Sequence, residues 1–277
     1  MYRLRPGAAV SISTLAHSMK SWGVLRMGVP CLATPVTSTC RLCILLLFVW
    51  SLANPSHGIA ADDGFEPIFD GKTLTGWSVI PREKQSHWSV RDGLLVGKTD
   101  GKGSDLIFHD KNLADYELKL SYRFRTKGNS GIHIRGLLGI SKTHTVSGYH
   151  ADFGHKGVGP EVLGSWDFHG YPRGSYLVQR GHRVVIAADG KKTLTRLDGA
   201  LKPSHIKERG WNDVHVRVRG YRMFFTINGK VASEVIDNEK AKRIQKGIIG
   251  LQLHGGPPME IEFRKIRLKR LKGNASP

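Results

Sequence analysis

Apolar and polar residues alternate along much of the chain after residue 62, as they do in β-strands that bury one face. The clearest case is the segment 114–125, in which every second residue is apolar and the residues between are polar or charged. Helical periodicity fails over the same window. The pattern predicts a long, half-buried strand whose buried face carries Ala114, Tyr116, Leu118, Leu120, Tyr122 and Phe124.

Tight turns are predicted where Asp-Gly and Asn-Gly pairs separate two apolar-rich runs. Asp92-Gly93 and Asn228-Gly229 both do so, and each pair suits a two-residue hairpin turn. Near the end of the chain, the doubled polar pair Arg264-Lys265 interrupts an alternating strand, which predicts a β-bulge.

Helices contribute little to the predicted fold. No window of helical period is long enough for a core helix; Asp237–Gln245 is expected to form a short surface turn of helix, and Lys191–Gly210 a long loop. Many short strands joined by Gly-rich turns are typical of an antiparallel sandwich. We therefore predict an all-β, single-domain sandwich.

Three short segments place small and polar residues opposite their apolar residues. They are Asn129–Arg135, Gly148–Phe153 and Ile248–His254. An ordinary solvated strand face is richer in Lys, Glu and Thr than these faces are. If the three strands share a sheet, their polar faces would form one candidate site over a floor of glycines, with the side chains of His133, Arg135, His150, Asp152, Gln252 and His254.

Each of these residues also has a purely structural interpretation. His133 could be a lone polar residue on a solvated face, His254 could end a strand, Asp152 could form a turn, and Arg135 could pair with that carboxylate. Tyr149 falls on the apolar register and is expected in the core. Three tryptophans in strand-like contexts are also expected to be core anchors: Trp77, Trp88 and Trp211.

The first 61 residues resemble an export signal and not part of the fold. They contain no acidic residue, and a basic residue precedes the short apolar run Leu42–Ala53, with small residues at Ala60-Ala61. The flank is long, so translation could start at Met19 or Met27. We expect cleavage after Ala60 or Ala61 and a periplasmic or extracellular domain over 62–277. The apolar run is short for a membrane span, so an uncleaved anchor is the alternative.

Cysteine content and charge narrow the function classes. The cysteines, Cys31, Cys40 and Cys43, all precede the expected cleavage point, so the mature domain would have no disulfide and no thiolate chemistry. Without the five basic residues of the first 60, 37 Lys and Arg face 23 acidic residues, a net charge of +14. These cations are spread over most strands without a nucleic-acid motif. They indicate a solvated surface attracted to anionic glycans or envelope, and no nucleic-acid partner.

Several short motifs carry a family resemblance through their order. In chain order they are Phe69-Asp70-Gly71-Lys72, Gly76-Trp77, Trp88-Ser89-Val90, Asp92-Gly93-Leu94-Leu95, Asp115-Tyr116-Glu117-Leu118, Asn129-Ser130-Gly131-Ile132, Gly148-Tyr149, Trp211-Asn212, Asn228-Gly229 and Gly247–Gly255. Over roughly Phe65–Leu271 the chain resembles the 3-keto-disaccharide hydrolase domain family, also described as 3-keto-glucoside 1,2-lyase and 3-keto-2-hydroxy-glucal hydratase. The resemblance implies a concanavalin A-like jelly roll whose concave sheet binds sugar.

The chain departs from the family pattern at two places. His150 stands where the family often has Glu or Gln. The segment Gly157–Gly174 is divergent and is expected to form the rim of the cleft, with Trp166, Asp167, His169 and Arg173.

The implied reaction starts from a sugar oxidised at C3, whose C2 proton is acidic because the resulting carbanion is an enolate. Removing that proton expels the C1 substituent, and water can then add to the product. The reaction needs a base, a positive group at the enolate oxygen and an acid near the leaving group. For the chain, this implies His254 or Asp152 as base, His150 as acid and Arg135 at the enolate. Substrate contacts are expected from His133, Gln252, Asn129, Trp166 and Arg173.

A divalent metal ion is a further candidate for stabilising the enolate. Four residues of the candidate site offer suitable ligands, although no compact spacing such as His-x-x-x-His occurs: His133, His150, Asp152 and His254. The two-carboxylate glycosidase route has little support, because the Glu-x-Asp-x-x-Glu string of jelly-roll glucanases is absent.

Three functions therefore compete. The first is an exported enzyme that cleaves 3-keto-glycosides supplied by a separate sugar 3-oxidoreductase. The second is a non-catalytic carbohydrate-binding jelly-roll module, whose cleft would rely on aromatic stacking and amides. The third is an interaction domain held to anionic polymers by its charge, whose binding should weaken with salt. Only the enzyme needs at least two titratable groups close together.

Overall fold

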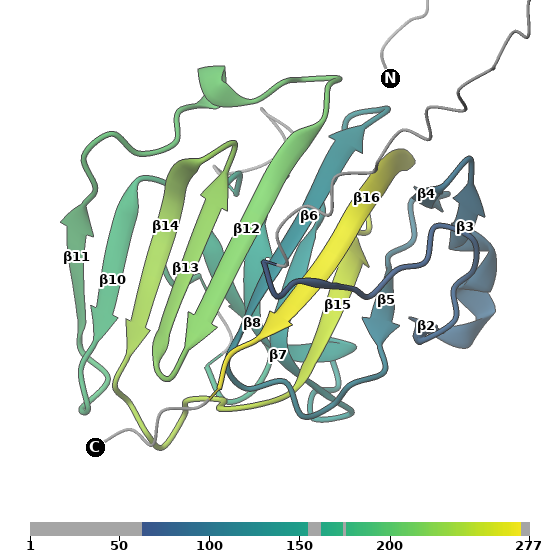
Figure 1. Cartoon of the computed structure of the whole chain (residues 1–277). Helices are drawn as coiled ribbons and strands as arrows, with labels where there is room; N and C mark the ends of the chain where they lie inside the picture. The colour runs from purple at the N-terminus through teal and green to yellow at the C-terminus, as the bar shows by residue number, and fades with distance from the viewer. Residues whose placement is uncertain (1–62, 155–161, 174–175, 273–277) are drawn as a thin grey trace, which may run out of the picture. The chain divides into compact units, whose positions relative to one another are not determined.

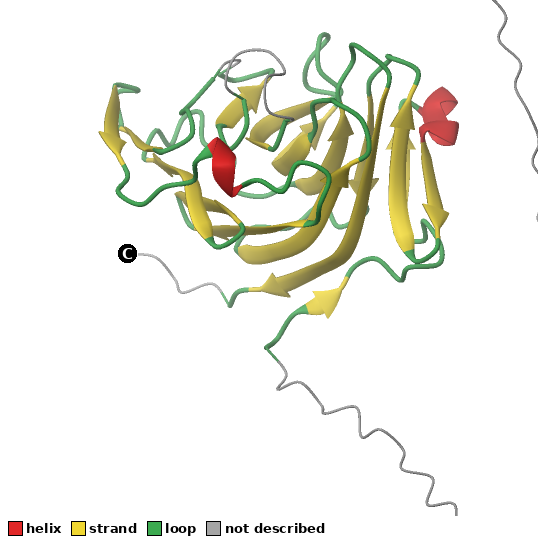
Figure 2. Cartoon of the chain, turned by 90° about the horizontal axis from the view of Figure 1, so that it is seen from above, coloured by secondary structure: helices red, strands yellow, loops and turns green. Residues whose placement is uncertain are grey.

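The computed structural model describes residues 63–154, 162–173 and 176–272, so the expected signal segment lies outside the described residues. Within them, strands stack as two facing β-sheets (Figures 1 and 2). The strands of the ten-stranded sheet are β1 (Glu66–Pro67), β3 (Trp88–Arg91), β4 (Leu94–Thr99), β6 (Tyr116–Phe124), β10 (His182–Ile186), β11 (Lys192–Arg196), β12 (Asn212–Arg219), β13 (Arg222–Ile227), β14 (Lys230–Asp237) and β16 (Met259–Arg270). The strands of the six-stranded sheet are β2 (Trp77–Ile80), β5 (Ser104–Phe108), β7 (Gly131–Leu138), β8 (Val146–Asp152), β9 (Trp166–His169) and β15 (Ile248–Leu253).

The strand orders confirm the predicted all-β jelly-roll sandwich. The ten-stranded sheet runs β11-β10-β14-β13-β12-β6-β16-β4-β3, with β1 added to β16. The six-stranded sheet runs β2-β5-β15-β7-β8-β9. All described strand pairs are antiparallel except β10 with β14, which is parallel.

The core fills the space between the two sheets. Strand β6 buries the predicted alternating residues from Tyr116 to Phe124, and β7 and β15 bury their apolar registers from the other sheet. Ala114, also predicted on that buried face, is exposed and precedes the strand. Tyr122 of β6 stacks on Phe153 at the end of β8, with ring centroids 4.4 Å apart. Tyr149, Trp77 and Trp88 are buried as expected. Trp211 is not: it lies at the sheet surface, where the guanidinium of Arg264 lies 4.0 Å from its ring.

The two predicted hairpin turns and the predicted β-bulge are confirmed. The β3–β4 and β13–β14 hairpins turn at Asp92-Gly93 and Asn228-Gly229, and all four residues have positive φ. The register of β16 shifts between Arg264 and Arg267, which is the predicted bulge.

Helical and loop predictions were less accurate. The described residues contain two 3₁₀ helices, Arg82–His87 and Pro203–His205, and neither was predicted. The segment Asp237–Gln245 contains a turn but no helix, and Lys191–Gly210 is not all loop because it includes β11. None of the described helices is long and apolar enough to cross a membrane.

Candidate functional site

The three polar-faced segments lie side by side in the six-stranded sheet, as the sequence predicted. Strand β7 pairs with β15 on one side and with β8 on the other. The register places His133 directly opposite His150 and opposite Gly250. Because Ile132 and Ile134 face the core, His133 projects from the opposite face of the sheet.

Imidazoles gather on that face. Strand β9 adds His169 beside β8, and the loop between β7 and β8 adds His144. The ring centroids of His133 and His150 lie 4.7 Å apart, those of His150 and His169 lie 4.3 Å apart, and those of His144 and His169 lie 5.3 Å apart. We call His133, His150 and His169 the histidine cluster.

Each member of the histidine cluster has a carboxylate close to one ring nitrogen. Nε2 of His133 donates to Asp105 on β5 at 2.9 Å. The other two nitrogen–oxygen distances are 3.1 Å from His150 Nδ1 to Asp152 and 3.6 Å from His169 Nε2 to Asp167.

Burial favours the neutral forms deep in this cluster. It lowers the pKa of His150 well below its usual range, and the neighbouring imidazoles act in the same direction. Burial likewise raises the pKa of Asp152 well above its usual range, with Asp167 adding repulsion. For His144, burial and then His169 lower the pKa.

Beside the cluster is a pocket of about 210 Å³. Its walls come from β5, β7, β9 and β15 and from the loops around them, including Asp105, His133, His144, His169, Gln252 and His254. His254 directly follows β15 and is exposed. His144 reaches the pocket from the loop that follows the C-terminal end of β7. Neither His150 nor Asp152 forms part of the pocket wall.

Arg135 does not share this face, so the sequence-based expectation was wrong. The register shifts between Ile134 and Leu137, and Arg135 itself has a φ of +51°. The bulge turns the side chain into the protein, where it is 1% exposed. Its guanidinium donates to the backbone oxygens of Ala114, Gly220 and Ile244 and pairs with Asp115. It therefore ties loops together and does not reach the pocket.

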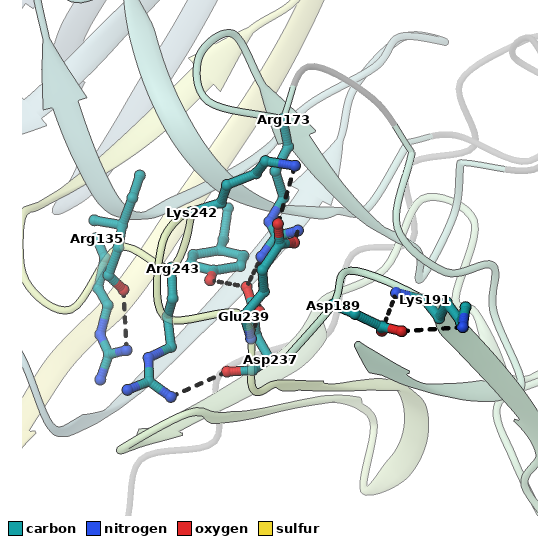
Figure 3. A network of polar contacts seen from close by, with 10 residues as sticks. Arg135, Arg173, Asp189, Lys191, Asp237, Glu239, Lys242 and Arg243 are labelled. Atoms are coloured by element: carbon teal, nitrogen blue, oxygen red, sulfur yellow. Dashed lines mark hydrogen bonds and ion pairs between the residues drawn. The ribbon is translucent and has the colours of Figure 1, made fainter. Parts of the chain in front are cut away.

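Two expected substrate contacts also lie elsewhere. Trp166 is 0% exposed and belongs to the core. Arg173 turns away from the pocket toward the end of β14, where it donates twice to the buried carboxylate of Asp237 at 2.7 Å and also bonds Glu239 (Figure 3). The hydroxyl of Tyr149 donates to the same Asp237 at 2.5 Å. These residues hold the segment after β9 in place.

Of the two amides expected to contact substrate, Gln252 belongs to the pocket wall and Asn129 does not. Gln252 lines the pocket, and its buried side-chain oxygen has no hydrogen-bond partner among the described residues. The side-chain oxygen of Asn129 is likewise buried and unpartnered, and its backbone oxygen accepts from the N–H of His254.

Sequence reasoning missed Asp105 and His144. Asp105 lies in a short strand beside the apolar run Leu106–Phe108, and that polar residue next to an apolar run was the available signal. His144 comes from a polar loop and left no periodic signal.

Most of the described domain matches a known protein family. Residues 64–269 match the family model described as a 3-keto-alpha-glucoside-1,2-lyase-like domain. The chain belongs to this family. The match confirms the resemblance seen in the motifs and covers every residue of the site described above.

Other similarities of this lyase-like domain are more distant. A Bacteroides thetaiotaomicron protein named 3-keto-disaccharide hydrolase is 38% identical over 78 residues, which are 25% of this chain and 27% of that protein. The alignment thus spans about a quarter of the relative's length.

Two solved structures share the fold. One is a protein from Parabacteroides distasonis ATCC 8503 named as a proposed glycosyl hydrolase, with a TM-score of 0.50, 18% identity, and coverage of 76% of this chain and 94% of its own. The other is a Bacillus subtilis protein of unknown function with a galectin-like fold, with a TM-score of 0.50, 9% identity, and coverage of 76% and 96%. At these identities the likeness shows the fold alone.

Proposed function

We propose that this domain cleaves 3-keto-glycosides by removing the C2 proton and eliminating the C1 substituent. The observation that carries the proposal is the pocket, because five imidazoles lie in or beside it and three carboxylates lie close to three of them, all within a family whose description names this chemistry. A site for moving protons needs titratable groups this close together. A sugar-binding cleft does not.

The proposed reaction balances without an outside oxidant. The base takes the C2 proton, the C2–H electron pair forms the enolate with the C3 ketone, and the C1–O bond then breaks as the enolate collapses. The leaving oxygen takes one proton and departs as the alcohol. Water adding at C1, with a proton returned at C2, completes a net hydrolysis.

The pocket wall suggests which imidazoles act. His254 is exposed and its Nδ1 contacts the backbone oxygen of Gly255, so Nε2 is the nitrogen available to substrate; we assign it as the base. His144 approaches from the opposite end of β7 and is assigned to the leaving oxygen. Asp152 as base and His150 as acid are set aside, because both are buried and neither lines the pocket.

In this proposal, substrate is contacted by residues in and next to the pocket wall. His133 and Gln252 line the pocket, and Asn129 lies behind His254. The oxidised glycoside would be supplied by a separate sugar 3-oxidoreductase, since nothing in this reaction oxidises C3. The export signal expected in 1–61 would place the reaction outside the cytoplasm.

Deuterium exchange at C2 tests the reaction type. We expect a 3-keto-disaccharide incubated with the protein in heavy water to gain deuterium at C2 or to release its aglycone. Because positioned acid–base groups contribute about 10²–10⁴-fold, His254→Ala should slow both by at least about 100-fold. The control is His215→Ala, since His215 pairs with Glu117 on the other sheet; it should keep the wild-type rate.

Two results would contradict the proposal. Binding of the sugar without exchange or cleavage would indicate a carbohydrate-binding module. Near-normal exchange in His254→Ala would remove His254 from the mechanism.

A further inference from the structure

The histidine cluster has more ligating atoms than hydrogen-bond partners. Nδ1 of His133 and both ring nitrogens of His150 are buried and have no hydrogen-bond partner among the described residues. A buried polar atom without a partner destabilises the fold, so such atoms in a folded protein call for a water or an ion. One ring nitrogen from each of His133, His150 and His169 lies within 4.8 Å of the other two. The three rings could therefore share one ligand.

The neighbouring carboxylates leave the right nitrogens free. Each cluster histidine has an aspartate oxygen near one ring nitrogen. Nε2 of His133 hydrogen-bonds Asp105 at 2.9 Å, whereas His150 Nδ1 lies 3.1 Å from Asp152 and His169 Nε2 lies 3.6 Å from Asp167, both without a hydrogen bond. Histidines that bind metals usually place their second nitrogen against a carboxylate in this way, which fixes the ring and raises its basicity. The hydrogen-bonded form of this pattern occurs at His133 and leaves its Nδ1 for the common ligand. The aspartates beside His150 and His169 are placed in the same way and would leave Nε2 of His150 and Nδ1 of His169 for that ligand.

We propose that His133, His150 and His169 bind one divalent transition-metal ion of the Zn²⁺ class. Imidazole nitrogens suit zinc, copper, iron and nickel better than magnesium or calcium. Three protein ligands with one open position are typical of catalytic zinc sites. His133 and His169 also line the pocket, so the open position would face the space proposed for substrate.

The backbone makes room for this arrangement. Gly131 lies across from Asp152 on β8, and a Cβ added there would stand 2.7 Å from Nε2 of His150. A glycine at this position leaves the space in which that ring lies over β7. The three ligands come from β7, β8 and β9, which are adjacent in the sheet and fix their spacing.

The role of the metal in the reaction rests on the proposed function, whereas metal binding itself does not. When bound, the ion would act as a Lewis acid toward negative charge developing on the substrate's C3 oxygen. This is the role that the sequence assigned to Arg135. Because Arg135 lies elsewhere, a metal ion held by the histidine cluster would supply the positive group that the proposed enolate needs.

Metal titration of the purified full chain tests the inference without any substrate. After chelator treatment and dialysis, Co²⁺ is added and followed by visible absorption, and Zn²⁺ is then used as competitor. We expect one tight equivalent with the absorption of low-coordinate Co²⁺, displaced by Zn²⁺. In His169→Ala this equivalent should weaken by more than about 100-fold, since even supporting residues are worth about 10–100-fold.

A matched control separates this site from chance binding. His215→Ala removes an imidazole from the other sheet and should leave the Co²⁺ titration unchanged, while circular dichroism checks that His169→Ala is folded. Equal Co²⁺ affinity in wild type and His169→Ala, or no tight equivalent, would overturn the inference. Full turnover by metal-free protein would leave the proposed function standing and remove the metal role. Tight Co²⁺ binding by a protein that shows no turnover would support the metal site and contradict the proposed function.

Discussion

At the scale of single residues, the site depends on glycines as much as on its titratable groups. Gly250 pairs opposite His133, and a Cβ there would come within 3.3 Å of that imidazole. Gly131 plays the same part for His150. The Asn-Ser-Gly-Ile motif therefore has a physical meaning: its glycine leaves the volume that a neighbouring strand's imidazole occupies.

Gly131→Ala tests this at the residue scale. The added Cβ would meet His150 Nε2 and the backbone oxygen of Ala151, each at 2.7 Å, so the ring must move out of the cluster. We expect Co²⁺ affinity to fall by about 10–100-fold, the range seen when the support of a metal ligand is lost. The control is Gly255→Ala, whose Cβ would meet nothing closer than 3.5 Å. Equal losses in both variants would show that the ring position does not matter.

At the scale of elements, the edge strand β9 carries His169 but has only four residues and one strand partner in the sheet order. Its support comes from the residues that follow it. Arg173 joins this segment to the end of β14 through Asp237 and Glu239, and Arg243 donates to the backbone oxygen of Asp237 (Figure 3). Asp237 is 0% exposed, so its charge depends on these partners.

Removing Arg173 should therefore be costly. Arg173→Met leaves two buried carboxylates without their shared cation, and breaking a buried pair in this way costs about 3–5 kcal/mol. We expect urea denaturation to show a loss of about 3 kcal/mol, because Tyr149 still donates to Asp237. Arg183→Met is the matched control: Glu234 keeps Arg222, so the loss should stay below about 1 kcal/mol. Similar losses in the two variants would contradict the supporting role of Arg173.

The elements also show which features of the fold and the site could be predicted from the sequence. Alternation identified β6, and Asp-Gly and Asn-Gly pairs identified two hairpins, because strand faces and two-residue turns are set by neighbours in the chain. The shared face of His133 and His150 followed from the same rule. Arg135 did not, since the bulge before Leu137 reverses its direction and depends on pairing with two other strands. Asp105 joined the site only through strand order, and His169, expected at the rim, joined the histidine cluster through the same strand order, which local patterns do not encode.

At the scale of the whole described domain, part of the positive charge is paired where it lies. Glu234 accepts from Arg183 and Arg222, Glu262 from Arg91 and Arg123, and Glu117 pairs with His215 and Arg217. Such pairs are typical of a solvated surface and contribute little individually. The pocket wall, in contrast, carries imidazoles, the carboxylate of Asp105 and small polar residues. Surface charge and pocket chemistry are therefore separate properties of the molecule.

Salt should separate these properties experimentally. Raising ionic strength from about 10 mM to about 1 M shortens the Debye length from about 30 Å to about 3 Å. Binding of a sulfated polysaccharide such as heparin depends on the dispersed cations, so we expect it to weaken by more than about tenfold. Turnover of an uncharged 3-keto-disaccharide depends on short contacts inside the pocket, so kcat/KM should change by less than about twofold. Both are measured on one preparation across one salt series. If turnover fell in parallel with heparin binding, the cationic surface would be part of substrate capture. That result would favour the interpretation of the protein as an interaction domain over the enzyme proposed from the pocket.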